Sequence, residues 1–389
     1  MTSNNQIPYG RHNISNHDIE AVVKVLKGDW LTTGPTVDLF EERLQKLTNS
    51  RAVAVSSGTA ALHCAYAAAG IGPGDEVITP PLTFIATQAT AALLGAKIVF
   101  ADVQEDTGNI DPQEIEAKIT SRTKAITMVD FAGHPCEIDE IRSIADRHNL
   151  LLIEDAAHSL GSTYKSKPVG NLADITTFSF FPTKNMTTGE GGAVITNSSE
   201  MYKKARLFGR QGLIRTESDF ILKADGPWHQ EIHNFGLNYR LPDMLCAIGI
   251  TQLESLTEFK LERSRVFSQY YKHLATIDQI KLPIKREYVD PMWHLFPIRV
   301  PSNLRKALYI HLRAHGYLVQ INYMPAHLHP VFSSQFKKGD FPNSETYYSE
   351  EISLPLFVAP EIFTDSYFER ISSCIQDFFR GSTLEKVKS

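Results

Sequence analysis

The chain has 389 residues, a net charge of −5 and four cysteines, and 42% of its residues are hydrophobic. This composition is typical of a globular protein with room for more than one domain. There is no basic cluster to favour nucleic acid, no apolar run near the roughly 20 residues of a membrane span, and no signal peptide in the polar N-terminus. The scattered cysteines form no C-x-x-C pair, so we expect reduced thiols, a cytoplasmic location and no metal site or disulfide framework.

Short apolar runs alternate with helical patterns between residues 50 and 200, which predicts an α/β domain with a mostly parallel sheet. Helical patterns such as Pro112–Thr120 and Ile138–Asn149 separate most of these runs. The predicted strands are Val53–Ser56, Glu76–Thr79, Ile98–Asp102, Ala125–Val129, Leu151–Glu154, Thr176–Phe180 and Ala193–Thr196. Ligands of such sheets usually bind beyond the carboxyl ends of the strands, which is where Asp155 and Ser179 fall.

The pattern changes after Asn238. A long helix is predicted from Leu241 to about Leu274, and strands are predicted at Trp293–Val300 and Leu318–Tyr323. We therefore expect a large domain over residues 1–250, followed by a smaller α+β domain over residues 251–389.

Lys184 lies between an apolar strand and a glycine cluster. Phe178, Phe180, Phe181 and Pro182 precede it. A lone lysine near glycines is usually a solvated surface residue, but this apolar setting favours partial burial. Burial lowers the pKa of a lysine and makes its amine nucleophilic.

Asp155 closes the apolar strand Leu151–Glu154. A carboxylate in that position is costly without a partner. The alternative is a cap on the next helix. Paired with Lys184, it provides what a pyridoxal 5'-phosphate (PLP) enzyme needs. The lysine amine forms a Schiff base with the cofactor aldehyde, and the carboxylate keeps the pyridinium nitrogen protonated.

Further segments fit the same cofactor. Gly58 and Thr59 open a helix directly after a strand, and such a helix N-terminus can bind a phosphate, although alone it would indicate only an ordinary N-cap. Ser179 is placed to donate to the same phosphate. Phe84 follows a strand and could stack on the pyridine ring, or it could be a core residue. For His158, contact with the phenolic oxygen of the cofactor and a role as a satisfied buried imidazole are about equally supported.

The histidine pairs of the chain do not have the spacing of known metal-binding motifs. His229 and His233 surround a glutamate that is one place too late for H-E-x-x-H, and His327 and His329 are only two residues apart. No dinucleotide-binding, P-loop or nucleophile-elbow motif is present.

Taken in order, these segments resemble the DegT-type sugar-nucleotide aminotransferases, a branch of the fold type I (aspartate aminotransferase-like) PLP enzymes. The resemblance spans nearly the whole chain, and the lysine segment is its most specific mark. The segments that carry it are Leu31–Pro35, Ser57–Leu62, Glu154–His158, Phe178–Lys184, Glu190–Gly192 and Gly236–Arg240.

The resemblance implies a homodimer with shared active sites. In the family an asparagine from the partner subunit reaches the cofactor phosphate, and Asn238 matches it. The segment with Tyr323 and His327 falls where relatives contact the nucleotide sugar. Many relatives carry a histidine where this chain has Phe181, which puts any role of that histidine here in doubt.

Within the family, the likeness implies transfer of an amino group, from L-glutamate as in relatives, to the C4 keto group of a UDP-linked 4-keto-6-deoxy-N-acetylhexosamine, as in pseudaminic acid biosynthesis. The segments behind this expectation are 130–136, 225–228 and 322–328. The alternatives are another 4-keto sugar nucleotide (perosamine or viosamine type), a non-catalytic PLP-binding regulator, and a PLP lyase acting on amino acids. The intact set of Lys184, Asp155 and Asn238 argues against the regulator, and no C-terminal arginine pattern supports the lyase.

Overall fold

The structure, a computed structural model, describes residues 6–387. Its centre is a seven-stranded sheet in the order β2-β10-β9-β6-β5-β3-β4. Strand β10 runs antiparallel to both of its neighbours, and the other strands are parallel. The strands are β2 (Arg51–Val55), β3 (Glu76–Thr79), β4 (Lys97–Phe100), β5 (Thr123–Val129), β6 (Leu151–Asp155), β9 (Ile175–Ser179) and β10 (Gly192–Thr196).

This sheet confirms the predicted α/β architecture, and each predicted strand overlaps an observed one. Asp155 is the last residue of β6 and Ser179 is the last residue of β9. These two parallel strands are neighbours, so their carboxyl ends bring both residues to the same edge of the sheet, as the sequence predicted.

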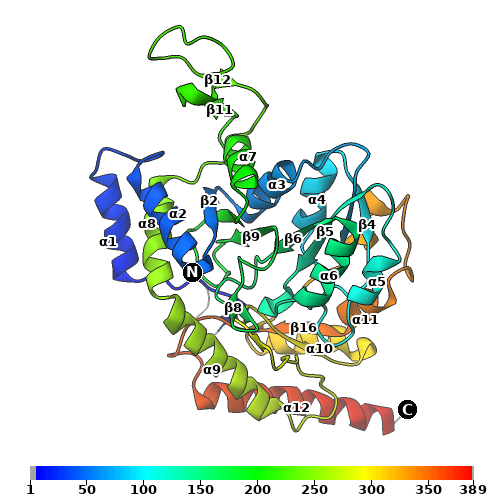
Figure 1. Cartoon of the computed structure of the whole chain (residues 1–389). Helices are drawn as coiled ribbons and strands as arrows, with labels where there is room; N and C mark the ends of the chain where they lie inside the picture. The colour runs from blue at the N-terminus through cyan, green and yellow to red at the C-terminus, as the bar shows by residue number, and fades with distance from the viewer. Residues whose placement is uncertain (1–5, 388–389) are drawn as a thin grey trace.

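Helices cover both faces of the sheet (Figure 1). Successive residues of β2 point to opposite faces, so Val53 and Val55 join one core while Ala52 and Ala54 join another. Helices α3, α4 and α7 pack on the first face, α2 and α6 pack on the second, and α8 packs against α2. The bounds are α2 (Pro35–Thr48), α3 (Gly58–Ala68), α4 (Ala86–Leu93), α5 (Pro112–Glu116), α6 (Ile138–His148), α7 (Ser199–Gly209) and α8 (Asp243–Glu254).

The C-terminal part has a core of its own, built almost wholly from residues after 265. The N-terminal strand β1 (Ile7–Pro8) joins it by pairing in parallel with β15 (Tyr317–Leu318). Its other elements are α9 (Leu256–Leu274), α10 (Ser302–Ala314), α11 (Pro342–Glu350), α12 (Asp365–Val387) and the antiparallel pair β14 (Phe296–Arg299) and β16 (Glu351–Leu354). Helix α1 (Asn16–Leu26) packs on α8, and β7 (Thr163–Tyr164), β8 (Lys167–Pro168) and β13 (Val289–Asp290) form a small sheet.

Two expectations for the C-terminal part were wrong in detail. The single helix expected from Leu241 is two helices, α8 and α9, because the Ser255 N–H bonds to the carbonyls of both Thr251 and Gln252 in a tightened turn. The strand expected at Leu318–Tyr323 is only the short β15. Beyond it the chain pairs with β16 through a single bridge, between Gln320 and Ser353.

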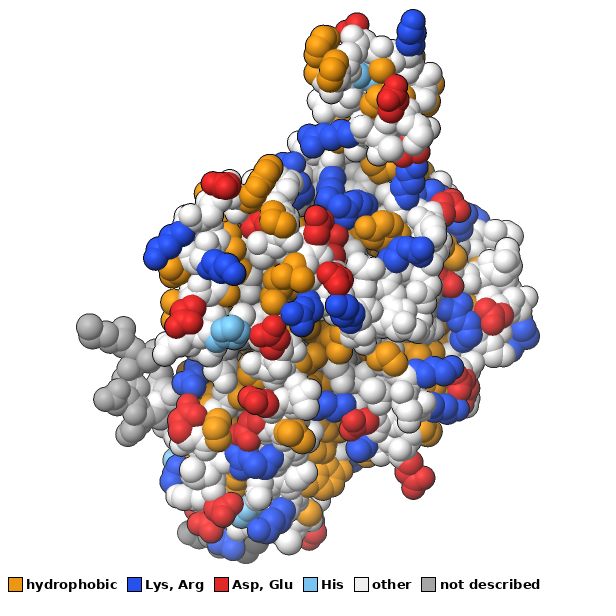
Figure 2. Space-filling model, turned by 60° about the vertical axis from the view of Figure 1, so that its left-hand side comes forward, with side chains coloured by type: hydrophobic (Ala, Val, Ile, Leu, Met, Phe, Trp, Pro, Cys, Tyr) orange, Lys and Arg blue, Asp and Glu red, His pale blue; other side chains and the backbone are white. Residues whose placement is uncertain are grey.

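A hairpin projects from the body between α7 and α8, at the top of Figure 1. It contains β11 (Leu213–Ile214) and β12 (Glu231–Ile232), which pair antiparallel. Figure 2 shows hydrophobic side chains on its surface, and Trp228 and Phe235 are 73% and 96% exposed. Among the helices that the structure describes, none is long and apolar enough to cross a membrane.

Candidate active site

The backbone around Lys184 is held in place by distant segments. The side-chain amide of Asn185 donates to the carbonyls of His158 (2.7 Å) and Met292 (3.0 Å). Buried Arg263 donates to the Lys184 carbonyl (3.3 Å) and to the Trp293 carbonyl (3.1 Å). The lysine segment is therefore fixed both to the loop after β6 and to the C-terminal part of the chain.

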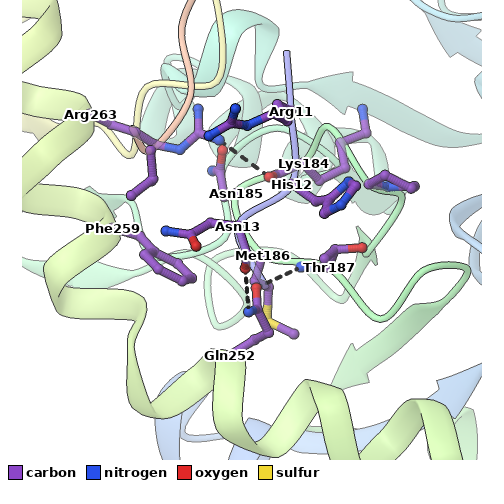
Figure 3. Close-up of a pocket in the computed structure, with 12 residues that line it drawn as sticks. Arg11, His12, Asn13, Lys184, Asn185, Met186, Thr187, Gln252, Phe259 and Arg263 are labelled. Atoms are coloured by element: carbon purple, nitrogen blue, oxygen red, sulfur yellow. Dashed lines mark hydrogen bonds between the residues drawn. The ribbon is translucent and has the colours of Figure 1, made fainter. Parts of the chain in front are cut away.

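The N-terminal segment lies over the same place (Figure 3). Arg11, His12 and Asn13 line a small pocket together with Lys184 and Arg263. Gln252 of α8 connects the N-terminal segment to the lysine segment. Its amide nitrogen donates to the Asn13 carbonyl (2.9 Å), and its oxygen accepts the Thr187 N–H (3.3 Å). Several elements thus pre-organise the lysine before any ligand binds.

The surroundings of Lys184 favour the unprotonated, nucleophilic form of its amine. Burial lowers its pKa to about 8, and the negative charge of Asp155 opposes this shift. Near pH 8 a large fraction of the amine is therefore unprotonated, as attack on a carbonyl requires. The apolar segment before the lysine predicted this partial burial.

Asp155 is a buried carboxylate that is bonded only to neutral donors. The Thr87 hydroxyl donates to Oδ2 (2.7 Å) and the Ala157 N–H donates to Oδ1 (3.2 Å). Burial raises the pKa of Asp155, while these two hydrogen bonds lower it. Within residues 6–387 it makes no salt bridge, although it lies close enough to Lys184 to affect that pKa. A cationic N–H would stabilise such a carboxylate.

His158 follows on the same loop and is also buried. The Tyr323 hydroxyl shares a hydrogen bond with His158 Nε2 (3.2 Å), and the His294 ring centroid lies 4.3 Å from that of His158. Burial holds the pKa of His158 well below its ordinary value, and the positive charge of Lys184 adds to the effect, so the ring is neutral. His158 Nδ1 has no hydrogen-bond partner among the described residues, which leaves a polar atom available to a ligand.

The N-terminus of α3 lies at one end of this cluster and is suited to an anion. Ser57 caps the helix by accepting the Ala60 N–H (3.0 Å). A Cβ on Gly58 would lie 2.7 Å from the Ser179 Cβ, and a Cβ on Gly192 would lie 2.4 Å from the Ser57 carbonyl oxygen. Only glycine allows these approaches, which place the Ser179 hydroxyl beside the helix N-terminus. Helix amides and hydroxyls together suit a phosphate.

The structure shows where the remaining predicted site residues lie. The Phe84 ring is 57% exposed and lies 6.0 Å from the Tyr323 ring, so it has a free face for stacking. Thr59 is exposed on the first turn of α3. Asn238 is exposed at the base of the hairpin, where its oxygen accepts a hydrogen bond from Arg240 (3.0 Å).

His327 is not brought into this group. Its ring is buried against Phe100 and Phe341, and Nε2 bonds to Glu345 (3.0 Å). In this structure it packs the core, and a direct role in substrate binding stays a prediction.

Other residues of the cluster were missed from the sequence. Thr87 bonds Asp155, the His294 ring contacts the His158 ring in a tilted arrangement, and Arg263 donates to the Lys184 carbonyl. None of them belongs to a motif with Lys184. Thr87 comes three places after Phe84, which is the only sequence signal that could have pointed to it.

The cluster contains the groups that PLP requires. A nucleophilic lysine, a buried carboxylate without a cation bonded to it, a free aromatic face and an anion-binding helix N-terminus meet at one edge of the sheet. The buried Nδ1 of His158, which has no hydrogen-bond partner among the described residues, adds an unsatisfied polar atom to this cluster. The residues present therefore fit PLP.

Comparison with known proteins agrees with this chemistry. Residues 12–375 match the DegT/DnrJ/EryC1/StrS aminotransferase family. The UDP-4-amino-4,6-dideoxy-N-acetyl-beta-L-altrosamine transaminase of Campylobacter jejuni is 36% identical over 356 residues, which cover 90% of this chain and 92% of that protein.

Solved structures agree as well. Helicobacter pylori PseC, an aminotransferase involved in the biosynthesis of pseudoaminic acid, superimposes with a TM-score of 0.88 at 30% identity, covering 97% of this chain and 100% of that one. The PLP form of the putative sugar aminotransferase Spr1654 from Streptococcus pneumoniae gives a TM-score of 0.88 at 28% identity, covering 96% and 99%. With its lysine, carboxylate and anion-binding helix in place, the chain belongs to the DegT/DnrJ/EryC1/StrS family and is a PLP-dependent sugar aminotransferase of fold type I.

Proposed function

We propose that this enzyme transfers an amino group from L-glutamate to the C4 keto group of a UDP-linked 4-keto-6-deoxy-N-acetylhexosamine, in a pathway of the pseudaminic acid type. The relative from C. jejuni and the PseC structure support this sugar class by their names and by the extent of the match. The observation that carries the reaction itself is the buried pair of Asp155, at the end of β6, and Lys184, in the loop that follows the neighbouring strand β9.

We assign roles to the residues of the cluster on the same basis. Lys184 would bind the cofactor aldehyde, and Asp155 would accept a hydrogen bond from the pyridinium N–H. Phe84 would stack on the ring, and His158 would lie beside its phenolic oxygen. Gly58, Thr59 and Ser179 would hold the phosphate. Tyr323, bonded to His158, places a hydroxyl from the C-terminal part at the site.

PLP supplies an aldehyde that takes up the amino group and a ring that accepts electrons. The chain supplies the proton transfers. Lys184, if displaced by the amino donor, would be placed to remove the proton from the donor's α-carbon and to return one during the second half of the reaction, since burial lowers its pKa to about 8. Asp155 would keep the ring nitrogen protonated because its charge stabilises the cationic form. The buried, neutral His158 can orient the ring oxygen without itself taking part in proton transfer.

We propose a homodimer in which each site is completed by its partner. The hairpin carries exposed Trp228 and Phe235, and exposed apolar side chains of this size mark contact surfaces. Asn238 lies at the base of this hairpin, with its side chain exposed. A partner's Asn238 reaching the phosphate would give the hairpin its function.

We also propose that the chain divides near residue 250 into the large domain over residues 1–250 and the small one over residues 251–389, since the C-terminal residues build their own core. Cys64, Cys136, Cys246 and Cys374 form no disulfide with one another, and we propose a location in the cytoplasm.

The substrate is tested by a screen of purified 4-keto sugar nucleotides with several amino donors, followed by mass spectrometry of the product. We expect the UDP-linked 4-keto-6-deoxy-N-acetylhexosamine to give the highest kcat/KM with L-glutamate. Preference for a perosamine-type or viosamine-type substrate would overturn the sugar assignment and keep the reaction class. The absence of turnover with every pair, despite bound PLP, would favour the regulatory alternative.

A further inference from the structure

A cluster of metal-binding side chains lies on the C-terminal part, outside the proposed active site. His311 and His315 are one turn apart on α10 and face Cys374 of α12. One ligand atom from each of the three lies within 4.8 Å of the others. They line an open groove that shares no residue with the pocket around Lys184. Both helices lie at the lower edge of Figure 1.

Both imidazoles already have one nitrogen committed to a backbone carbonyl. His315 Nδ1 lies 2.8 Å from the His311 carbonyl oxygen, and His311 Nε2 lies 3.1 Å from the Cys374 carbonyl oxygen. A carbonyl only accepts, so these nitrogens carry the hydrogen of each neutral ring. The other nitrogen of each ring then presents a lone pair. Metal-binding histidines are normally oriented in this way, through the second ring nitrogen.

Charged side chains of both signs line the same groove: Glu361, Glu369 and Asp377 are acidic, and Arg370 is basic. Asp377 lies one turn beyond Cys374 on α12. A bound metal would displace the Cys374 thiol proton. Each binding event would release one proton as the thiolate–metal bond forms.

We propose that His311, His315 and Cys374 bind one Zn²⁺ per chain and thereby join α10 to α12. Two imidazoles at positions i and i+4 of one helix, with one thiolate, are a ligand set that suits zinc, and a water would complete the four-coordinate site. The sequence alone could not indicate this site because the thiol lies on a different helix, far along the chain. The role is structural. The metal stabilises the C-terminal part and takes no part in amino transfer.

The test uses the full-length, untagged, PLP-loaded chain after treatment with a chelator. Titration with Co²⁺ should produce the absorption band of tetrahedral cobalt in the red part of the visible spectrum, where PLP does not absorb. The band should saturate at one Co²⁺ per chain, and addition of Zn²⁺ should abolish it. Saturating Zn²⁺ should raise Tm by ~5 °C. Cys374→Ser and His315→Ala should each weaken metal binding at least ~10-fold, since each removes one ligand.

His148→Ala provides the matched control, because this histidine is also partly exposed on a helix and interacts with a carboxylate, Glu116. It should bind cobalt as the wild type does. Lys184→Ala should also bind it normally, which separates this site from chelation by PLP. Unchanged PLP content and metal-free Tm would show that the ligand variants fold. The proposal is overturned if cobalt does not bind, or if Cys374→Ser and His315→Ala keep the cobalt spectrum and its affinity.

Discussion

The segment around Lys184 and the hairpin that projects beyond α7 are built in opposite ways. The lysine segment is fixed by hydrogen bonds of Asn185, Arg263 and Gln252, which connect it to four other parts of the chain. The hairpin contacts little of its own chain and exposes aromatic side chains such as Phe235. The chain thus organises its chemical centre internally and leaves a surface that only another molecule can cover.

This difference separates two kinds of variant. Changes in the lysine cluster should act within one chain and on the chemical step. Changes at the base of the hairpin should act on the site of the partner.

The largest effect is expected for Lys184→Ala, which should abolish turnover. It removes both the covalent link to the cofactor and the proton-transferring group, and the second of these alone is worth about 10²–10⁴-fold. Activity is measured with the best substrate pair from the screen, alongside a circular dichroism spectrum. Lys165→Ala is the control and should leave activity unchanged, since this exposed lysine pairs with Asp139 and lies over the Tyr164 and Tyr288 rings, none of which belongs to the lysine cluster. Substantial turnover by Lys184→Ala would rule out its role.

Asp155→Asn should lower kcat by at least about 10²-fold, because one strong charge interaction at a catalytic centre is worth several kcal/mol. The amide keeps the size of the side chain and can still accept the Thr87 hydrogen bond, so the loss reports the charge. Stopped-flow measurement of the half-reaction with the amino donor isolates the chemical step. Near-normal rates would mean that another residue holds the ring nitrogen.

Mixing two inactive variants tests whether a residue of the partner subunit completes each active site. A Lys184→Ala chain mixed with an inactive Asn238→Ala chain should recover activity, because one site of each mixed dimer receives neither defect. Random mixing makes half of the dimers mixed, so up to about a quarter of wild-type sites should return. Differently tagged chains, purified together, confirm the exchange of subunits. Mixed dimers without activity would show that each site is built within a single chain.

The smallest effect concerns stability and pH. Glu351 is buried beneath the segment that leads to Tyr323, where it accepts the Asn322 N–H (2.8 Å), and burial raises its pKa from 4.5 to about 8. Between these values the folded chain holds a proton that the unfolded chain has lost. The free energy of unfolding therefore falls as pH rises, by up to about 1.4 kcal/mol per pH unit.

Glu351→Gln removes the titrating carboxyl group. Between pH 5 and pH 8 the Tm of the variant should therefore decline less than the Tm of the wild type. In the wild type the Ser353 hydroxyl donates to one Glu351 oxygen and the Asn322 N–H donates to the other. The amide of the variant keeps one acceptor oxygen, for the Asn322 N–H, and can donate to the Ser353 oxygen. Thermal melts across that pH range are the measurement. Parallel curves for the variant and the wild type would contradict the shifted pKa.

The sheet was predictable from sequence because its strands are buried on both faces and read as short apolar runs between helical patterns. The positions of Asp155 and Ser179 followed directly, since each ends such a run. The break at Ser255 was not predictable, because the apolar spacing continues through it and only the backbone hydrogen bonds change.

The site was predictable where residues are adjacent in sequence and hidden where the fold brings them together. Lys184 is marked by its apolar and glycine neighbours. Thr87, His294 and Arg263 come from three other segments and belong to no motif. His327 illustrates a different difficulty. The family resemblance predicts a substrate-binding role for it, but its ring lies buried against Phe341 in the structure. Pairings over long sequence distances depend on the tertiary structure, and sequence spacing does not encode them.

The central claim is that Lys184 carries PLP, and borohydride trapping tests it most directly. The purified protein should be yellow. Reduction with borohydride followed by digestion and peptide mass spectrometry should then find the cofactor on the peptide that contains Lys184. A phosphopyridoxyl label on any other lysine, or none on a protein that contains PLP, would contradict the account.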